Sequence, residues 1–131
     1  MSTQASKSID TFANPAPHRD YQINFNCPEF TCLCPKTGQP DFAIVYIRYI
    51  PKDLCVELKS LKLYMASYRN IGAFHEAITN KICNDLATII NPNYLEIKIK
   101  FNVRGGIYTE VQCRNINKQW TDELSLINSR S

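Results

Sequence analysis

Alternation of apolar and polar residues predicts the strands of this chain. Between residues 94 and 103, leucine, isoleucine, phenylalanine and valine occupy every second position, with glutamate, lysine and asparagine between them. This is the pattern of a half-buried antiparallel strand. Arg104-Gly105-Gly106 then predicts a tight turn, and residues 107–113 predict the next strand. Residues 42–50 are mostly β-branched or aromatic, which predicts a strand covered on both faces.

Apolar residues at helical spacing predict the main helix over residues 74–90, which Asn91-Pro92 ends. Its apolar stripe is Phe74, Ile78, Ile82, Leu86 and Ile89. A shorter helix is predicted over residues 60–68, where helix formers mix with apolar residues, and Asn70-Ile71-Gly72 ends it.

The remaining strands complete the predicted fold class. Residues 21–25 alternate and predict a short extended segment, whereas residues 54–58 predict a strand that returns from 42–50 as an antiparallel hairpin. The order strand, strand, helix, helix, strand, strand predicts an α+β fold, with an antiparallel four-stranded sheet and helices on one face. Because such a sheet has two open edges, we expect pairing between subunits to close it into a ring, as a cyclic homo-oligomer.

The chain length of 131 residues suits one domain, which we expect over residues 21–131. Residues 1–20 are predicted to be a flexible N-terminal arm, because Asn14-Pro15-Ala16-Pro17 interrupts regular structure there. The polar tail over residues 114–131 predicts at most a small helix around Trp120.

Charge and cysteine content exclude several classes of protein. The net charge of +3 is dispersed, which argues against a nucleic-acid partner and remains compatible with a small anionic ligand. Without a secretory signal or a run of apolar residues that could span a membrane, the protein is expected to be cytoplasmic, with its six cysteines as thiols. Cys27, Cys32 and Cys34 are spaced C-x4-C-x-C without a nearby histidine, so we expect no metal.

The segment over residues 33–41 combines a thiol and a carboxylate in one bend. Pro35 biases Cys34 towards an extended backbone, and the residues after it favour turns. Cys34 and Asp41 can therefore face each other across a small gap, as covalent chemistry with proton delivery requires. Lys36 is close enough in sequence to favour the Cys34 thiolate.

Three other short motifs suggest ligand binding. Lys59 and Lys62 lie three residues apart at the start of a predicted helix, where two ammonium groups suit a phosphate. At the start of the main helix, Glu76 can accept N–H bonds from a purine-like ring, and His75 can donate to a ring carbonyl. Arg104 beside two glycines suits a phosphate or ribose.

Together these motifs resemble the NADPH-dependent 7-cyano-7-deazaguanine reductases, the nitrile reductases of queuosine biosynthesis in their short single-domain form. The residues that carry the resemblance are Leu-Cys-Pro-Lys-Thr-Gly-Gln-Pro-Asp (33–41), Glu-Leu-Lys-Ser-Leu-Lys-Leu-Tyr (57–64), Ser-Tyr-Arg-Asn (67–70), Phe-His-Glu (74–76) and Arg-Gly-Gly (104–106). The resemblance implies the tunnelling fold, in which subunits join into a β-barrel ring and rings stack. It also implies a decamer with active sites between subunits, and a 7-deazapurine nitrile as the small-molecule partner.

The same resemblance implies a role for each motif. Cys34 would attack the nitrile carbon to form a thioimide, Asp41 would handle protons, and two hydrides from NADPH would give the amine without a metal. The residues expected to hold the substrate are Val56, Glu57, Leu58, His75 and Glu76, and those expected to hold NADPH are Lys59, Lys62, Arg104 and Gly105. Leu58 stands where some members of the family have serine.

Two other interpretations stay open at the level of sequence. A zinc-dependent cyclohydrolase of the same fold group could recruit Cys34, His75 and Cys113 as ligands. A non-catalytic purine-binding module would keep His75 and Glu76 but would not need Cys34 together with Asp41.

Overall fold

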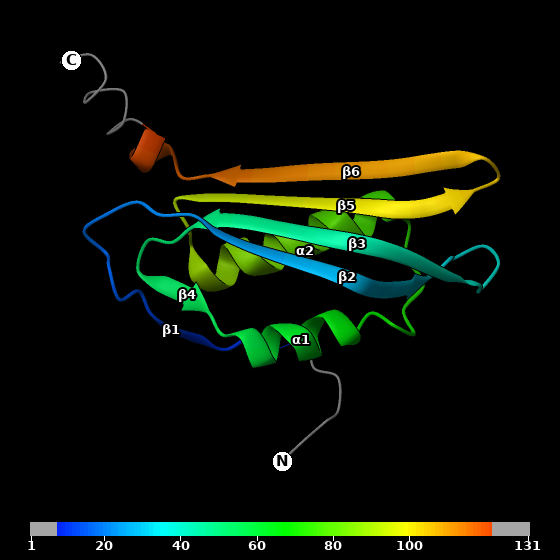
Figure 1. Cartoon of the computed structure of the whole chain (residues 1–131), viewed down its shortest axis with the longest axis horizontal. Helices are drawn as coiled ribbons and strands as arrows, with labels where there is room; N and C mark the ends of the chain where they lie inside the picture. The colour runs from blue at the N-terminus through cyan, green and yellow to red at the C-terminus, as the bar shows by residue number, and fades with distance from the viewer. Residues whose placement is uncertain (1–7, 122–131) are drawn as a thin grey trace.

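A computed structural model describes residues 8–121 of the chain and places helices over one face of an antiparallel sheet (Figure 1). The sheet has the strand order β2-β3-β5-β6, and a separate two-stranded sheet pairs β1 with β4. The strands are β1 (Thr11–Ala13), β2 (Ile23–Leu33), β3 (Pro40–Ile50), β4 (Leu54–Val56), β5 (Tyr94–Arg104) and β6 (Ile107–Ile116). The helices are α1 (Leu58–Ala66) and α2 (His75–Ile90). The predicted α+β class and four-stranded antiparallel sheet are confirmed.

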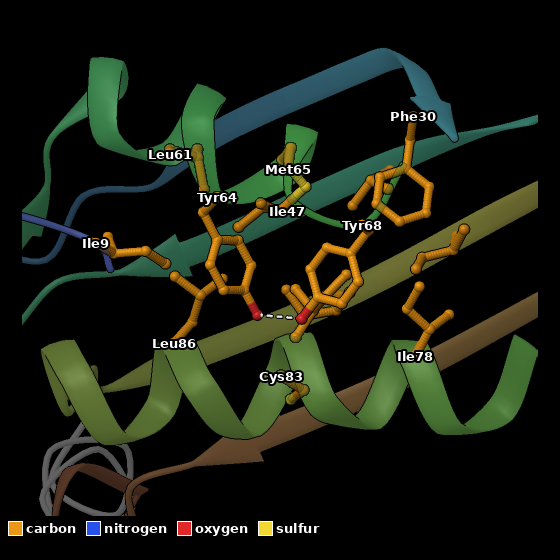
Figure 2. Close-up of a cluster of buried hydrophobic side chains, with 14 of the residues drawn as sticks. Ile9, Phe30, Ile47, Leu61, Tyr64, Met65, Tyr68, Ile78, Cys83 and Leu86 are labelled. Atoms are coloured by element: carbon orange, nitrogen blue, oxygen red, sulfur yellow. Dashed lines mark hydrogen bonds between the residues drawn. The ribbon is translucent and has the colours of Figure 1, made fainter. Parts of the chain in front are cut away.

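The hydrophobic core fills the space between the two helices and the sheet. Figure 2 shows α1 and α2 side by side over the same face, with Tyr64 and Tyr68 between them. Their hydroxyls lie 2.6 Å apart, and Tyr64 also donates to Asp85 of α2 at 2.5 Å. Burying a hydroxyl without a hydrogen-bond partner costs free energy. These hydrogen bonds therefore favour the arrangement in which α1 packs against α2.

The hairpin of β5 and β6 agrees with the alternation in the sequence. On β5 the side chains facing the helices are buried, namely Leu95, Ile97, Ile99 and Phe101. Gly105 and Gly106 form the turn with φ of 57° and 79°, values that glycine adopts at little steric cost.

The first hairpin differs from the prediction, which paired residues 42–50 with residues 54–58. β3 instead lies between β2 and β5, so both of its edges are already hydrogen-bonded. The short β4 turns away from the large sheet and pairs with β1, and its Val56 N–H donates to the Tyr49 hydroxyl at 3.0 Å. The local turn at residues 51–53 was therefore a poor guide to the partner of β4.

β2 is longer than the predicted segment 21–25. It continues past Pro28 through an irregularity between Cys27 and Phe30. Because β2 is an edge strand and the irregularity removes a ladder bond, a proline is tolerated there.

The flexible arm predicted over residues 1–20 is wrong for residues 8–20. Ile9 is buried in the core, and the Asn14 side chain donates to Lys52 O at 2.8 Å while its backbone N–H donates to Asp53 O at 2.9 Å. Residues 11–13 supply the partner that β4 lacks in the large sheet. Residues 1–7 lie outside the described residues. Residues 118–121 are helical, in line with the small helix expected around Trp120, and the tail from residue 122 lies outside the described part.

Helices of the described region, residues 8–121, are all too short or too polar to span a membrane.

Candidate active site

Cys34 lies in a closed turn between β2 and β3. Its backbone N–H donates to Gln39 O at 2.8 Å, and the Gly38 N–H donates back to Cys34 O at 2.8 Å. Gly38 has φ of 73°, a left-handed conformation that favours glycine at this point of the turn. The turn chemistry of the sequence therefore produces a rigid loop that presents the thiol.

Hydrogen bonds within this turn lower the pKa of the Cys34 thiol. The Thr37 hydroxyl contributes most, followed by the backbone N–H groups of Thr37 and Lys36, whereas burial and the charge of Asp41 act in the opposite direction. Lys36 thus acts on the sulfur through its backbone, although the sequence suggested its ammonium group. Cys32, two residues earlier, is fully buried, and burial raises its pKa to about 11. Of these two thiols, only Cys34 has the character of a nucleophile.

Leu33 ties this turn to the start of α2. Its N–H donates to Ile71 O at 2.9 Å, and its carbonyl accepts from the Ala73 N–H at 3.1 Å. α2 begins two residues later at His75, with Phe74 as its N-cap. The exposed Glu76 lies in the first turn of α2, where the helix dipole favours a carboxylate.

Asp41 is a buried carboxylate that contacts the His75 imidazole and the Arg104 guanidinium. Its side chain is 4% exposed, and its Oδ2 lies 3.4 Å from His75 Nε2. Its Oδ1 accepts from the Arg104 guanidinium, which reaches it from the end of β5. The bent segment 33–41 therefore brings Cys34 and Asp41 to one end of the sheet, and α2 and β5 add His75 and Arg104 there.

Phe101 is a member of this site that the sequence did not reveal. Its ring stacks on the His75 imidazole with centroids 3.6 Å apart and planes inclined by 7°. In the sequence Phe101 is one apolar position of an alternating strand, so nothing separates it from ordinary core residues. Arg104 was expected to hold cofactor, and its contact with Asp41 could not be inferred from positions 63 residues apart.

The other predicted site residues gather where β4 passes into α1. Glu57 is the N-cap of α1, and its carboxylate accepts from the backbone N–H groups of Lys59 and Ser60. Leu58 is 57% exposed, and Lys62 is exposed one turn further along α1. This junction therefore presents apolar surface and ammonium groups close together.

The two groups of residues lie at opposite ends of the sheet within one chain (Figure 1). Val56 contacts Tyr49, which lies eight residues beyond Asp41 on β3. At roughly 3.3 Å per residue, the strand separates the two ends by about 26 Å. A small substrate cannot touch Cys34 and the segment 56–58 of the same subunit.

Among the described residues 8–121, no three histidine, cysteine or acidic side chains come together as metal ligands. Cys113, the third candidate ligand of the zinc hypothesis, donates instead to Asn80 Oδ1 at 3.4 Å.

Comparison with known proteins identifies the family of this chain. The family model described as "QueF-like protein" matches residues 40–120. A protein of Halorhodospira halophila named NADPH-dependent 7-cyano-7-deazaguanine reductase is 58% identical over 115 residues, which cover 88% of this chain and 98% of that relative. A protein of the same name from Thioalkalivibrio sulfidiphilus is 55% identical over 120 residues, covering 92% of this chain and 93% of the relative.

A solved structure, that of the archaeosine synthase QueF-Like in the apo form, superposes with a TM-score of 0.65 at 20% identity, covering 75% of this chain and 94% of that one. At that identity the likeness concerns the fold. The matches of sequence, in contrast, extend over nearly the whole chain and its relatives. The chain therefore belongs to the QueF-like family, among the NADPH-dependent 7-cyano-7-deazaguanine reductases.

Proposed function

We propose that the protein reduces the nitrile of 7-cyano-7-deazaguanine to an aminomethyl group with NADPH, as a step of queuosine biosynthesis in the cytoplasm. The observation that carries the proposal is the pairing of a thiol of lowered pKa, Cys34, with the buried carboxylate of Asp41 at one end of the sheet. A nitrile is a poor hydride acceptor, and a nucleophile beside a proton donor overcomes this difficulty.

Covalent addition is the first step. The Cys34 thiolate forms a C–S bond to the nitrile carbon, and the nitrogen takes a proton, which gives a thioimide. Asp41 supplies this proton, with His75 3.4 Å away to exchange protons with it. When bound, NADPH supplies the two hydrides that the product requires.

Release of the sulfur links the two reductions. In the first reduction the carbon takes a hydride and the nitrogen takes a second proton through Asp41, which gives a carbon bonded to hydrogen, the sulfur and an amino group. The lone pair of this amino group then expels the Cys34 thiolate and leaves a protonated imine. The second hydride converts this imine into the primary amine. Two hydrides and two protons are consumed in all, and the Cys34 thiolate is regenerated.

A complete substrate site requires a second subunit. His75 and Glu76 begin α2 at the end of the sheet that carries Asp41 and the Cys34 turn, whereas the segment 56–58 lies about 26 Å away at the other end of the strand. We therefore assign the segment 56–58 and Lys59 of one subunit to the site whose Cys34, Asp41 and His75 come from its neighbour.

Exposed apolar side chains at both ends support this assembly. Ile107 is 68% exposed and Phe42 53% exposed at the Cys34 end, and Leu58 is 57% exposed at the other. A neighbouring subunit that packs over these ends would remove this apolar surface from water. With β2 and β6 as open edges, strand pairing between subunits gives the ring of the tunnelling fold, and stacked rings give a decamer. Size-exclusion chromatography with light scattering should show a stable large oligomer, and a persistent monomer would contradict the composite site.

Intact-mass spectrometry tests the chemistry directly. After mixing with the nitrile in the absence of NADPH, the protein should gain the mass of the substrate. Cys34→Ala should abolish this gain and all NADPH consumption, whereas the control Cys113→Ala, which removes a partly buried thiol of β6, should retain both. Full activity in Cys34→Ala would refute the covalent route.

A further inference from the structure

A groove lies between β2 and α1, apart from the Cys34 turn. Its volume is about 480 Å³, within the range of small-molecule sites. Its walls are largely apolar and include Phe25, Phe30, Leu58, Leu61 and Met65. A flat ring and its sugar can bury their faces against such a surface.

Two cations border this groove. Lys62 and Arg69 line it together with one acidic residue, Glu29. Within the region that the structure describes, the Lys62 and Arg69 side chains take part in no ion pair or hydrogen bond, so both can meet an anion. A second hollow, of about 390 Å³, differs because Asp20 and Asp53 there offset the charges of Arg19 and Lys52.

The order of groups along α1 matches the order of groups in a phosphorylated dinucleotide. Leu58 begins the helix, Lys62 lies about 6 Å further along its axis, and Arg69 lies roughly 10 Å beyond Lys62. In NADPH the nicotinamide is followed by a ribose, the pyrophosphate, and the adenosine ribose that carries the 2′-phosphate. Leu58 thus suits the nicotinamide ring, Lys62 the pyrophosphate, and Arg69 the 2′-phosphate.

We infer that this groove holds the dinucleotide along α1, and that Arg69 binds the 2′-phosphate and so makes the protein specific for NADPH over NADH. The inference rests on the proposed function. It places the nicotinamide near Leu58, at the junction that we assign to the substrate site of the neighbouring subunit. Arginine suits this role because its planar guanidinium makes two parallel hydrogen bonds to a phosphate.

Direct binding tests the role of Arg69 without turnover. Isothermal titration of the full-length protein with NADP⁺ should give a Kd that rises about tenfold or more in Arg69→Leu, the loss expected for a hydrogen bond between charged groups. The Kd for NAD⁺, which lacks the 2′-phosphate, should not change. The Kd of Arg69→Lys for NADP⁺ should lie between those of wild type and Arg69→Leu, because lysine keeps the charge but cannot make the two parallel hydrogen bonds of the guanidinium. Lys118→Leu removes one positive charge outside the groove and should leave both constants unchanged.

Kinetics give the second measurement. In Arg69→Leu the ratio of kcat/KM for NADPH to that for NADH should fall by about the same factor of ten or more. An unchanged ratio, or an equal loss with both cofactors, would overturn the assignment of the 2′-phosphate to Arg69.

Covalent addition of the nitrile to Cys34 separates this inference from the proposed function. The addition needs no cofactor, so Arg69→Leu should form the adduct at the wild-type rate. If wild type forms the adduct and consumes NADPH, but Arg69→Leu keeps the wild-type preference for NADPH over NADH, only the inference about Arg69 fails. If wild type forms no adduct, the proposed function fails.

Discussion

Asp41→Asn is the substitution that probes the site most directly. It keeps the size and shape of the side chain but removes the charge that faces His75 at 3.4 Å and the Arg104 guanidinium. The amide can still accept a hydrogen bond on its oxygen, but it cannot give up a proton to the substrate nitrogen. The variant should therefore fold, bind the nitrile and fail in proton delivery.

The exposure of the partners sets the size of the effect on stability. Removing one partner of a fully buried ion pair costs about 3–5 kcal/mol, and removing an exposed pair costs about 0–1 kcal/mol. Here Asp41 is 4% exposed, but His75 is 21% and Arg104 43% exposed, so water can solvate both when the carboxylate is lost. We expect a loss of about 1–3 kcal/mol, which corresponds to a Tm lower by roughly 3–10 °C.

The effect on turnover should be larger than the effect on stability. Loss of a positioned general acid lowers a rate by about 100- to 10,000-fold. NADPH consumption, followed by its absorbance, should fall by at least about 100-fold in Asp41→Asn. The gain of substrate mass on Cys34 should appear more slowly than in wild type, because thioimide formation also uses the Asp41 proton.

Asp85→Asn is the matched control. Asp85 accepts from Tyr64 and pairs with Lys81, between the helices and away from the Cys34 turn. It should lower Tm without lowering the rate of the folded protein. If Asp41→Asn retained more than about a tenth of wild-type turnover, Asp41 would not be the acid.

Three further substitutions test individual contacts. Thr37→Val removes the hydroxyl that does most to lower the pKa of Cys34, so alkylation of the thiol by iodoacetamide should require a higher pH. Valine keeps the shape of threonine but also removes the acceptor of the Gln39 N–H at 3.2 Å, so circular dichroism should check that the variant remains folded. Phe101→Leu keeps an apolar side chain but removes the ring stacked on His75, a contact of about 0.5–1.5 kcal/mol. Turnover should fall severalfold, whereas the free energy of unfolding in urea should fall by little more than that amount. Tyr49→Phe leaves the buried Val56 N–H of β4 without its acceptor, so the free energy of unfolding measured in urea should fall by about 1–3 kcal/mol. An unchanged midpoint of the urea transition would show that this hydrogen bond contributes nothing to stability.

Long elements with one repeated pattern were predictable from the sequence. The apolar stripe of α2 and the alternation of β5 each extend over many residues, so chance matches to the pattern are few. Both lie within one or two residues of their predicted ends. Short elements were harder, because three residues such as those of β4 show no period. The partner of β4 depends on which strands already cover β3, and that is a property of the whole sheet.

The candidate site was likewise predictable only where its residues are close together in the sequence. Cys34 and Asp41 lie seven residues apart in a segment rich in turn residues, so their approach follows from local bending. The contact of Arg104 with Asp41 joins residues 63 apart, and the stacking of Phe101 on His75 joins β5 to α2. Such contacts depend on the register between β3 and β5 and on where α2 begins, and no motif encodes either.

The tether at Leu33 affects which mutations the protein can tolerate. Both of its hydrogen bonds, to Ile71 O and from the Ala73 N–H, join main-chain atoms. Substitutions over residues 71–73 other than Ala73→Pro, which lacks the N–H, would thus change side chains without removing these two hydrogen bonds. A single inserted or deleted residue between Tyr68 and His75 would instead shift which main-chain groups face Leu33. The separation between sulfur and imidazole is consequently protected against point mutation but vulnerable to changes in chain length.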